Sequence, residues 1–285
     1  MRDFSYHAPA SLAEAHSLLA QYGDAARLMA GGTALTVMLK QSLVQADHLV
    51  SLQRIPGLRR IHLQSDGLHI GALARLRDVE TSPLVKEHAP LLAEVYRQVA
   101  TVRIRNQATV GGGIVHADPA QDPPPALLVL DARLRLVSRA GQREVPVREF
   151  FLDYYETALR PGEVLTEVIV PLQTKHARAI YLRYTPRTQD DYPTVSVAAL
   201  ARVERGVCRE MRVALGAAAP TALRITAVEE ALRGKRVSQA AVRRAAALVA
   251  EQVSPLEDFR GSADYKRDMA VVFTRRALEG VLGLG

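Results

Sequence analysis

Two glycine-rich stretches carry most of the information in this sequence: Ala30-Gly31-Gly32-Thr33 and Thr109-Val110-Gly111-Gly112-Gly113. Each follows an apolar run that reads as a strand, and each leads into a new segment. Consecutive glycines let neighbouring N–H groups point the same way, and they let a ligand approach the backbone without meeting a Cβ. Together the two stretches predict a bilobed cleft for a dinucleotide. The alternative interpretation is a pair of tight turns that need positive φ.

The first stretch lies in a pattern typical of a small parallel unit. Ser11 begins a capping box, and the helix it opens ends at Gly23. An apolar strand is expected over residues 26–30, a second helix capped by Thr33, and another strand over residues 48–52. This order places the first glycines at the N-terminus of a helix, where anions bind well.

After Arg60 the pattern becomes antiparallel. Short apolar runs separated by turn residues predict strands at 61–63, 68–70, 132–138, 143–147 and 164–170. Pro90 opens a helix that runs to about Val99. Residues 171–177 lose this periodicity and predict a domain boundary. Beyond it, three β-like runs (179–184, 194–203 and 209–217) precede two helical segments.

Composition excludes several classes of protein. The 285 residues are 48% hydrophobic and 24% charged, which suits a globular chain of two domains. No apolar run approaches the roughly 18–20 residues of a membrane helix, and the N-terminus has no signal-peptide core, so a cytoplasmic protein without a membrane span is expected. The single cysteine, Cys208, excludes an internal disulfide and an iron–sulfur cluster held by this chain alone.

The net charge of +7 is spread along the chain. Aromatic residues make up only 5%, tryptophan is absent, and no basic stretch is interleaved with aromatics, so nucleic-acid binding is not expected. A basic, non-catalytic assembly protein stays open as an interpretation from a different class. A yellow colour of the purified protein would separate that class from a flavoprotein.

Other candidate groups carry weaker signals. The second stretch lacks the last glycine of the Rossmann fingerprint, and no Walker lysine follows either stretch. His116 has no histidine or carboxylate at a metal-ligand spacing, so it is interpreted as structural and no metal site is expected. Asp122 is expected to accept hydrogen bonds either from ribose hydroxyls or from its own loop. Cys208 lies in a β-like run and reads as a packed thiol.

Taken together, these segments resemble a known family, the FAD-binding medium subunits of the molybdenum hydroxylases, which include the xanthine dehydrogenase and carbon monoxide dehydrogenase types. The resemblance covers almost the whole chain. It rests on the segments Ala30–Thr33, Asp47–Leu52, Ile104–Gly112, His116–Pro119, Phe150–Phe151, Pro161–Leu165, Val170–Pro171 and Gly261–Arg267. The cysteine-rich insertion by which some members hold a four-iron cluster is missing.

The resemblance implies an α+β fold. Residues 1–174 would form a FAD-binding domain of the vanillyl-alcohol-oxidase-like (PCMH) type, with subdomains at about 1–57 and 58–174. Residues 175–285 would form a C-terminal α+β domain of the carbon monoxide dehydrogenase flavoprotein type, with a three-stranded antiparallel sheet and helices.

The resemblance also implies the cofactor site, although it identifies no catalytic residue. Both glycine stretches would hold the FAD pyrophosphate, Asp122 matches an aspartate near the ribose and adenine, and Leu165 matches an apolar residue near the flavin. Arg183 stands where the family often has a flavin-contacting lysine. Gly113 replaces the usual asparagine, and Ala34 replaces a common polar residue. The implied FAD-binding residues are Ala30, Gly31, Gly32, Thr33, Ala34, Thr109, Val110, Gly111, Gly112, Gly113, Asp122, Leu165 and Arg183.

The implied function is electron transfer in an oxidoreductase complex. The chain would take electrons from 2Fe-2S clusters of a small partner subunit and pass them through FAD to NAD, a quinone or oxygen. A large partner would carry molybdopterin, and the complex would be a dimer of heterotrimers. The alternative is a self-contained flavin oxidase of the same fold, against which the absence of an evident substrate-binding domain argues.

Overall fold

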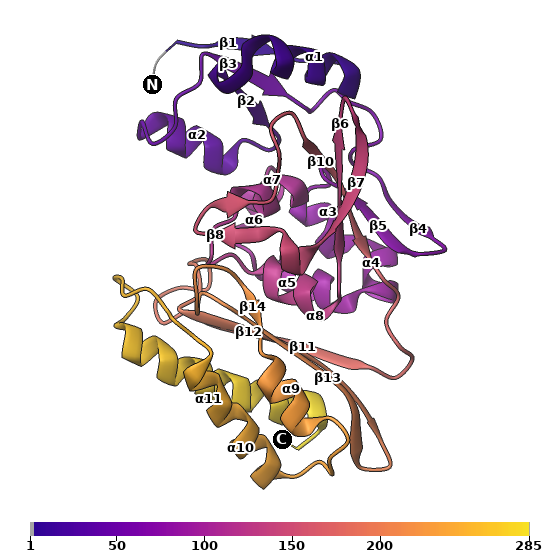
Figure 1. Ribbon diagram of the computed structural model, residues 1–285, viewed down its shortest axis with the longest axis vertical. Helices are drawn as coiled ribbons and strands as arrows, with labels where there is room; N and C mark the ends of the chain where they lie inside the picture. The colour runs from indigo at the N-terminus through magenta and orange to yellow at the C-terminus, as the bar shows by residue number, and fades with distance from the viewer. Residues whose placement is uncertain (1–2, 285) are drawn as a thin grey trace.

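The computed structural model describes residues 3–284. Three structural units follow one another along the chain, each built around its own sheet (Figure 1). The N-terminal unit and the C-terminal unit lie at opposite ends of the molecule, with the second unit between them (Figure 1). The fold is a mixture of helices and strands, as the sequence predicts.

The N-terminal unit is a parallel three-stranded sheet with strand order β1-β3-β2. Its elements are β1 (Ser5–His7), α1 (Leu12–Tyr22), β2 (Ala26–Met29), α2 (Thr33–Lys40) and β3 (His48–Ser51). Ser11 caps α1 by accepting a hydrogen bond from the N–H of Glu14 at 3.2 Å, and Gly23 ends the helix in a positive-φ conformation. The predicted strand, glycine turn, helix and strand are therefore confirmed.

The second unit is an antiparallel five-stranded sheet with strand order β4-β5-β10-β6-β7. Its strands are β4 (Ile61–Gln64), β5 (Gly67–Gly71), β6 (Arg133–Ser138), β7 (Gly141–Pro146) and β10 (Val164–Val170). A small hairpin is added by β8 (Phe151–Asp153) and β9 (Glu156–Thr157). The predicted antiparallel set is thus confirmed, and β10 lies in its centre between β5 and β6.

The helices of this unit pack against the sheet and against one another. They are α3 (Leu76–Thr81), α4 (Pro83–His88), α5 (Pro90–Gln98), α6 (Val102–Arg105), α7 (Val110–His116) and α8 (Pro123–Val129). The helix predicted from Pro90 is α5. Every residue of α8 is buried, because this helix lies between the five-stranded sheet and the C-terminal unit.

The C-terminal unit corrects one expectation. Its antiparallel sheet has four strands rather than three: β11 (Arg178–Tyr184), β12 (Val195–Glu204), β13 (Val207–Gly216) and β14 (Leu223–Arg224). The added strand, β14, pairs through two residues only, which is too short for an alternating pattern to appear in the sequence.

Both faces of this sheet are covered. The helices α9 (Thr226–Leu232), α10 (Gln239–Ala247) and α11 (Ala263–Leu282) lie on the outer face, while α5 and α8 contact the strands from the other side (Figure 1). Residues Val195–Ala201 of β12 are consequently all buried. The inward side chains of Tyr181, Ala198 and Leu200 join the same apolar core as the five-stranded sheet. The C-terminal unit therefore completes the core of the second unit.

No helix among residues 3–284 is both long and apolar enough to cross a lipid bilayer.

Candidate functional site

The first glycine stretch links β2 to the N-terminus of α2. Gly32 occupies the cap position of α2 with φ of 75°, a left-handed backbone that glycine adopts readily. A Cβ on Gly31 would lie 2.3 Å from the carbonyl oxygen of Gln107, so only glycine lets the two stretches approach this closely. The side-chain amide of Gln107, two residues before the second stretch, donates to the Gly31 carbonyl at 3.0 Å. The two stretches, far apart in sequence, are therefore in direct contact.

This stretch presents free hydrogen-bond donors. Within residues 3–284, no protein acceptor takes the N–H groups of Gly31, Gly32, Thr33 or Ala34. These N–H groups lie at the positive end of the α2 dipole. Backbone donors in this position bind phosphate oxygens, because the N–H groups are aimed outward and the helix end favours negative charge.

The second glycine stretch is helical, contrary to the expectation of a turn after a strand. Residues Val110–His116 form α7, and Thr109 caps it by accepting from the Gly112 N–H at 3.2 Å. The N–H groups of Val110 and Gly111 donate to the carbonyls of Ala74 and Ala72, at 2.9 and 2.8 Å. None of the three glycines has positive φ. The three glycines of the second stretch therefore supply a surface without side chains, and their N–H groups already have protein partners.

Close packing explains why glycines stand in this helix. A Cβ on Gly111 would lie 2.5 Å from the Cβ of Ala72, and one on Gly112 would lie 2.8 Å from the Thr109 hydroxyl and 3.4 Å from the Cβ of Ala30. Gly113 is different, since its Cβ would meet only the side-chain oxygen of Gln121 at 3.7 Å, an ordinary contact.

A cavity of about 660 Å³ opens between the two stretches. It is lined by both glycine stretches, by the start of β10, and by residues 190–192 of the C-terminal unit. Every FAD-binding residue proposed from the sequence lines this cavity, with the exception of Arg183. Apolar side chains such as Leu28, Leu35 and Leu165 form much of its wall. A volume of this size with few polar groups is typical of a cofactor pocket.

Gln121 is a candidate that the sequence did not reveal. Its side chain lines the cavity and is buried, and its amide nitrogen has no hydrogen-bond partner within residues 3–284. A buried donor without an acceptor is costly, so a ligand acceptor is the natural partner. No spacing or motif in the sequence marks a glutamine in this role.

Asp122 is held by the C-terminal unit. Tyr181 donates its hydroxyl to Oδ1 of Asp122 at 2.5 Å, and the Arg183 guanidinium lies 3.3 Å from Oδ2. Burial raises the pKa of Asp122 to about 6, although Arg183 and Tyr181 both act to lower it. Both carboxylate oxygens therefore contact protein groups, and neither bonds to the Asp122 loop, which was one of the two roles expected of this residue.

Arg183 lies behind the wall of the cavity. Its guanidinium donates to the carbonyl oxygens of Gln98, at the end of α5, and of Asp191, in addition to its contact with Asp122. The side chain thus connects the second unit to the segment that carries the cavity-lining residues 190–192. In this structure its partners are protein groups, and a direct contact with flavin stays a prediction.

The neighbours and burial of His116 and Cys208 fit structural roles for both side chains. His116 lines the cavity, its ring lies 5.4 Å from that of Tyr155, and burial lowers its pKa against the opposing effect of Asp118. Tyr155 in turn donates to Asp118 at 3.1 Å. Cys208 is buried within β13, and burial raises the pKa of its thiol, which fits the predicted packed residue.

The site suits a flavin dinucleotide. Free amides at a helix N-terminus match a pyrophosphate, the glycine surface allows it to approach, and the apolar wall matches an aromatic ring system. The fold and the cavity together define a dinucleotide-binding flavoprotein. Residues 2–173 match the family model described as the FAD binding domain in molybdopterin dehydrogenase, and residues 180–281 match the CO dehydrogenase flavoprotein C-terminal domain. The chain belongs to the family of FAD-binding medium subunits of molybdenum hydroxylases and is an oxidoreductase flavoprotein subunit.

Similar proteins agree with this assignment. The chain is 38% identical to the carbon monoxide dehydrogenase medium chain of Hydrogenophaga pseudoflava, with 96% of each chain covered. It is 30% identical to a xanthine dehydrogenase FAD-binding subunit of Escherichia coli, over 100% of this chain and 99% of that one. The solved carbon monoxide dehydrogenase of Hydrogenophaga pseudoflava superposes with a TM-score of 0.96 at 39% identity, covering 99% and 98%. Quinoline 2-oxidoreductase of Pseudomonas putida superposes with a TM-score of 0.94 at 33% identity, over the same shares.

Proposed function

We propose that this chain is the electron-transfer subunit of a molybdenum hydroxylase. It takes electrons from 2Fe-2S clusters on a small partner subunit and passes them to NAD, a quinone or oxygen. The observation that carries this proposal is the row of free N–H groups at residues 31–34, which faces a cavity with an apolar wall. Bound FAD supplies the redox chemistry, since flavins exchange electrons singly or in pairs.

The residues of this chain bind and orient the cofactor. The first glycine stretch donates hydrogen bonds to the pyrophosphate, and the second lets it approach α7 closely. Gln121 supplies a buried donor, and Leu165 forms part of the apolar wall against the flavin ring. Asp122 lines the cavity, and Arg183 lies behind it; their contact holds the C-terminal unit against the second unit. The wall also excludes water from the bound ring.

The assembly is part of the same proposal. Relatives are named as medium chains, and a medium chain implies a large and a small partner. We infer a large molybdopterin subunit and a small 2Fe-2S subunit, arranged as a dimer of heterotrimers. We also infer a FAD-binding domain over residues 1–174, with subdomains at 1–57 and 58–174, and a C-terminal domain over 175–285. The family models, which match residues 2–173 and 180–281, support this division.

The purified chain is expected to contain one noncovalently bound FAD. The cavity offers hydrogen bonds and packing for a noncovalent cofactor, and the single cysteine, Cys208, is buried in β13 and does not line the cavity. Acid precipitation followed by chromatography of the supernatant checks this. Flavin that stays with the precipitated protein, or a colourless chain that cannot be reconstituted with FAD, would contradict it.

Substrate oxidation is expected to require the partners. Expressed alone, the chain should bind FAD and show no turnover with aldehydes or N-heterocycles, because the molybdenum centre that oxidises them would lie on the large partner. Co-expressed with its molybdenum and iron–sulfur subunits, it should co-purify with them, and its flavin should bleach when substrate is added. Flavin reduction by substrate in the isolated chain would instead support the self-contained oxidase.

A further inference from the structure

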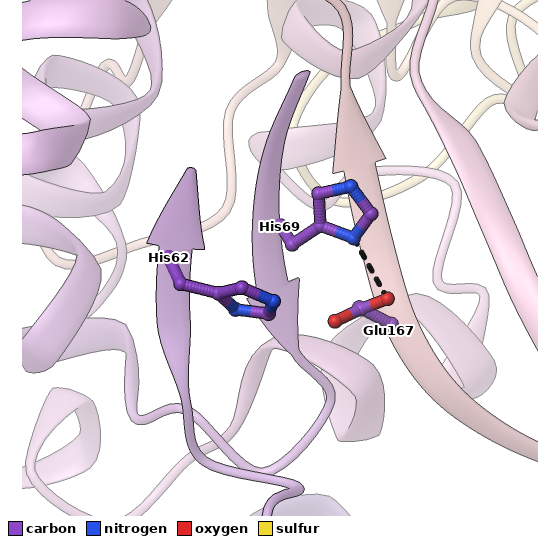
Figure 2. A group of neighbouring side chains, drawn as sticks. All are labelled: His62, His69 and Glu167. Carbon is purple, nitrogen blue, oxygen red and sulfur yellow. Dashed lines mark hydrogen bonds and ion pairs between the residues drawn. The ribbon is translucent and has the colours of Figure 1, made fainter. Parts of the chain in front are cut away.

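Three potential metal ligands converge on the five-stranded sheet, away from the glycine stretches. His62 comes from β4, His69 from β5 and Glu167 from β10, and Figure 2 shows their side chains meeting over neighbouring strands. One ligand atom from each lies within 4.8 Å of the others. His69 is fully buried, whereas His62 and Glu167 are partly exposed. A small ion can therefore reach the cluster from the surface.

Each ring nitrogen of His69 has a carboxylate neighbour, and one of these carboxylates could orient the ring for a metal. Its Nε2 lies 2.8 Å from Asp66 Oδ1, and its Nδ1 lies 2.9 Å from Glu167 Oε2. A histidine that ligates a metal through one nitrogen usually donates the other N–H to a carboxylate, which fixes the ring. Asp66 occupies the orienting position, and Nδ1 faces the other two ligands.

Two atoms in the cluster lack partners. Among residues 3–284, the buried Nδ1 of His62 has no hydrogen-bond partner, while its Nε2 lies 2.8 Å from the Gln64 amide nitrogen. The Oε1 of Glu167 is also free, since both His69 and Arg135 contact Oε2. An unsatisfied buried nitrogen costs free energy that a bound ion could recover, with rotation of the ring selecting which nitrogen binds.

The surrounding charges permit a cation. Arg135 contacts Glu167, Arg133 contacts Asp66, and Arg60 acts electrostatically on His62, so three guanidinium groups oppose a bound ion. The three carboxylates of Asp66, Glu167 and Glu144 balance these positive charges, so the surroundings are neutral when both histidines are neutral.

We propose that His62, His69 and Glu167 form a site for a divalent transition-metal ion, with Zn²⁺ as the best fit. Two imidazoles and one carboxylate are ligands that suit Zn²⁺, and a fourth position stays open to water. The ion binds Nδ1 of His69 in its unprotonated form, so any proton on that nitrogen leaves to solvent when the ion binds. The ion joins β4, β5 and β10, and β10 also carries Leu165 of the cavity wall. The site stabilises this sheet and takes no part in the flavin chemistry.

Titration of the chelator-treated full chain with ZnCl₂ by calorimetry tests this proposal. One Zn²⁺ should bind per chain, and Co²⁺ in its place should give the visible absorption of a tetrahedral nitrogen–oxygen site. His62→Ala and Glu167→Gln should abolish this binding. Asp66→Asn, which changes only the orienting group, should weaken it about 10–100-fold.

His176→Asn is the matched control, because His176 is exposed and asparagine tolerates its left-handed backbone. This variant should bind Zn²⁺ as the wild type does. All variants should keep their FAD, which shows that they fold and separates this proposal from the proposed function. A chain that takes up no Zn²⁺, or His62→Ala and Glu167→Gln variants that bind it with unchanged affinity, would overturn the proposal.

Discussion

Gly112→Val is expected to lower FAD affinity by about 100-fold while the chain still folds. The new Cβ would lie 2.8 Å from the Thr109 hydroxyl and 3.4 Å from the Cβ of Ala30, so the side chain enters the space where the two glycine stretches face each other. The stretches must shift to make room, and a hydrogen bond to the charged pyrophosphate that is lost in this way is worth about 1.5–3 kcal/mol, where every 1.4 kcal/mol is tenfold in affinity. Titration of the flavin-free protein with FAD, followed by fluorescence quenching, measures the effect.

Gly113→Ala is the matched control in the same helix. Its Cβ would meet only Gln121 Oε1 at 3.7 Å, and alanine is a better helix former than glycine. This variant should bind FAD about as tightly as the wild type. The backbone of Gly112 is helical, so the expected loss of FAD affinity comes from the valine side chain between the two glycine stretches rather than from a disfavoured φ. Normal FAD content in folded Gly112→Val would remove α7 from the site.

Asp122→Ala is expected to lower the free energy of unfolding by about 3–5 kcal/mol. The substitution leaves the guanidinium of Arg183, which is only 7% exposed, without its carboxylate, and it leaves the buried Tyr181 hydroxyl without this acceptor. Removing one partner of a buried ion pair has this cost because the other charge stays buried. Urea unfolding of Asp122→Ala, Arg183→Met and the double variant measures both the loss and the coupling energy.

Asp264→Ala provides the surface comparison. Asp264 pairs with Arg267 at 2.5 Å, but its side chain is 90% exposed, so we expect a loss of less than about 1 kcal/mol. If Asp122→Ala cost no more than Asp264→Ala, the buried pair would not hold the C-terminal unit in place.

The buried carboxyl of Asp122 makes the stability of the chain depend on pH, in a direction that its raised pKa defines. The pKa of Asp122 is about 6 in the folded chain and 3.8 for an ordinary aspartate, so the native state binds the proton more tightly than the unfolded state does. Its contribution to stability is fully present below pH 3.8 and is lost as the pH rises through 6. The stability of the wild type relative to Asp122→Asn should therefore increase by about 1–3 kcal/mol between pH 7 and pH 4. A difference independent of pH would contradict this.

Much of the fold could be predicted from local patterns. The helix capped by Ser11, the parallel order of β2, α2 and β3, and the antiparallel strands of the second unit follow from caps, turn residues and apolar periodicity. These signals act over a few residues, so a single sequence contains them. The motif resemblance added what periodicity does not contain: the FAD-binding family to which the chain belongs.

The tertiary structure decided how the site works. The sequence shows two similar glycine stretches, but only the fold determines which amides stay free: the carbonyls of Ala72 and Ala74 accept the N–H groups of Gly111 and Val110 in the second stretch. In the same way, the family resemblance predicts that Arg183 contacts the flavin. In the structure, its guanidinium contacts the carbonyl oxygens of Gln98 and Asp191 and the carboxylate of Asp122.

The sequence by itself therefore determined the family, the two stretches and most elements, whereas the tertiary structure decided which groups face the cavity. The four-stranded C-terminal sheet, the row of free N–H groups at residues 31–34 and the cluster of His62, His69 and Glu167 depend on contacts between distant segments. Glu167 lies 98 residues from His69 in sequence and 2.9 Å from it in space. Spacing in a single sequence does not encode such contacts, because the register of distant strands is set by how a whole apolar face is buried.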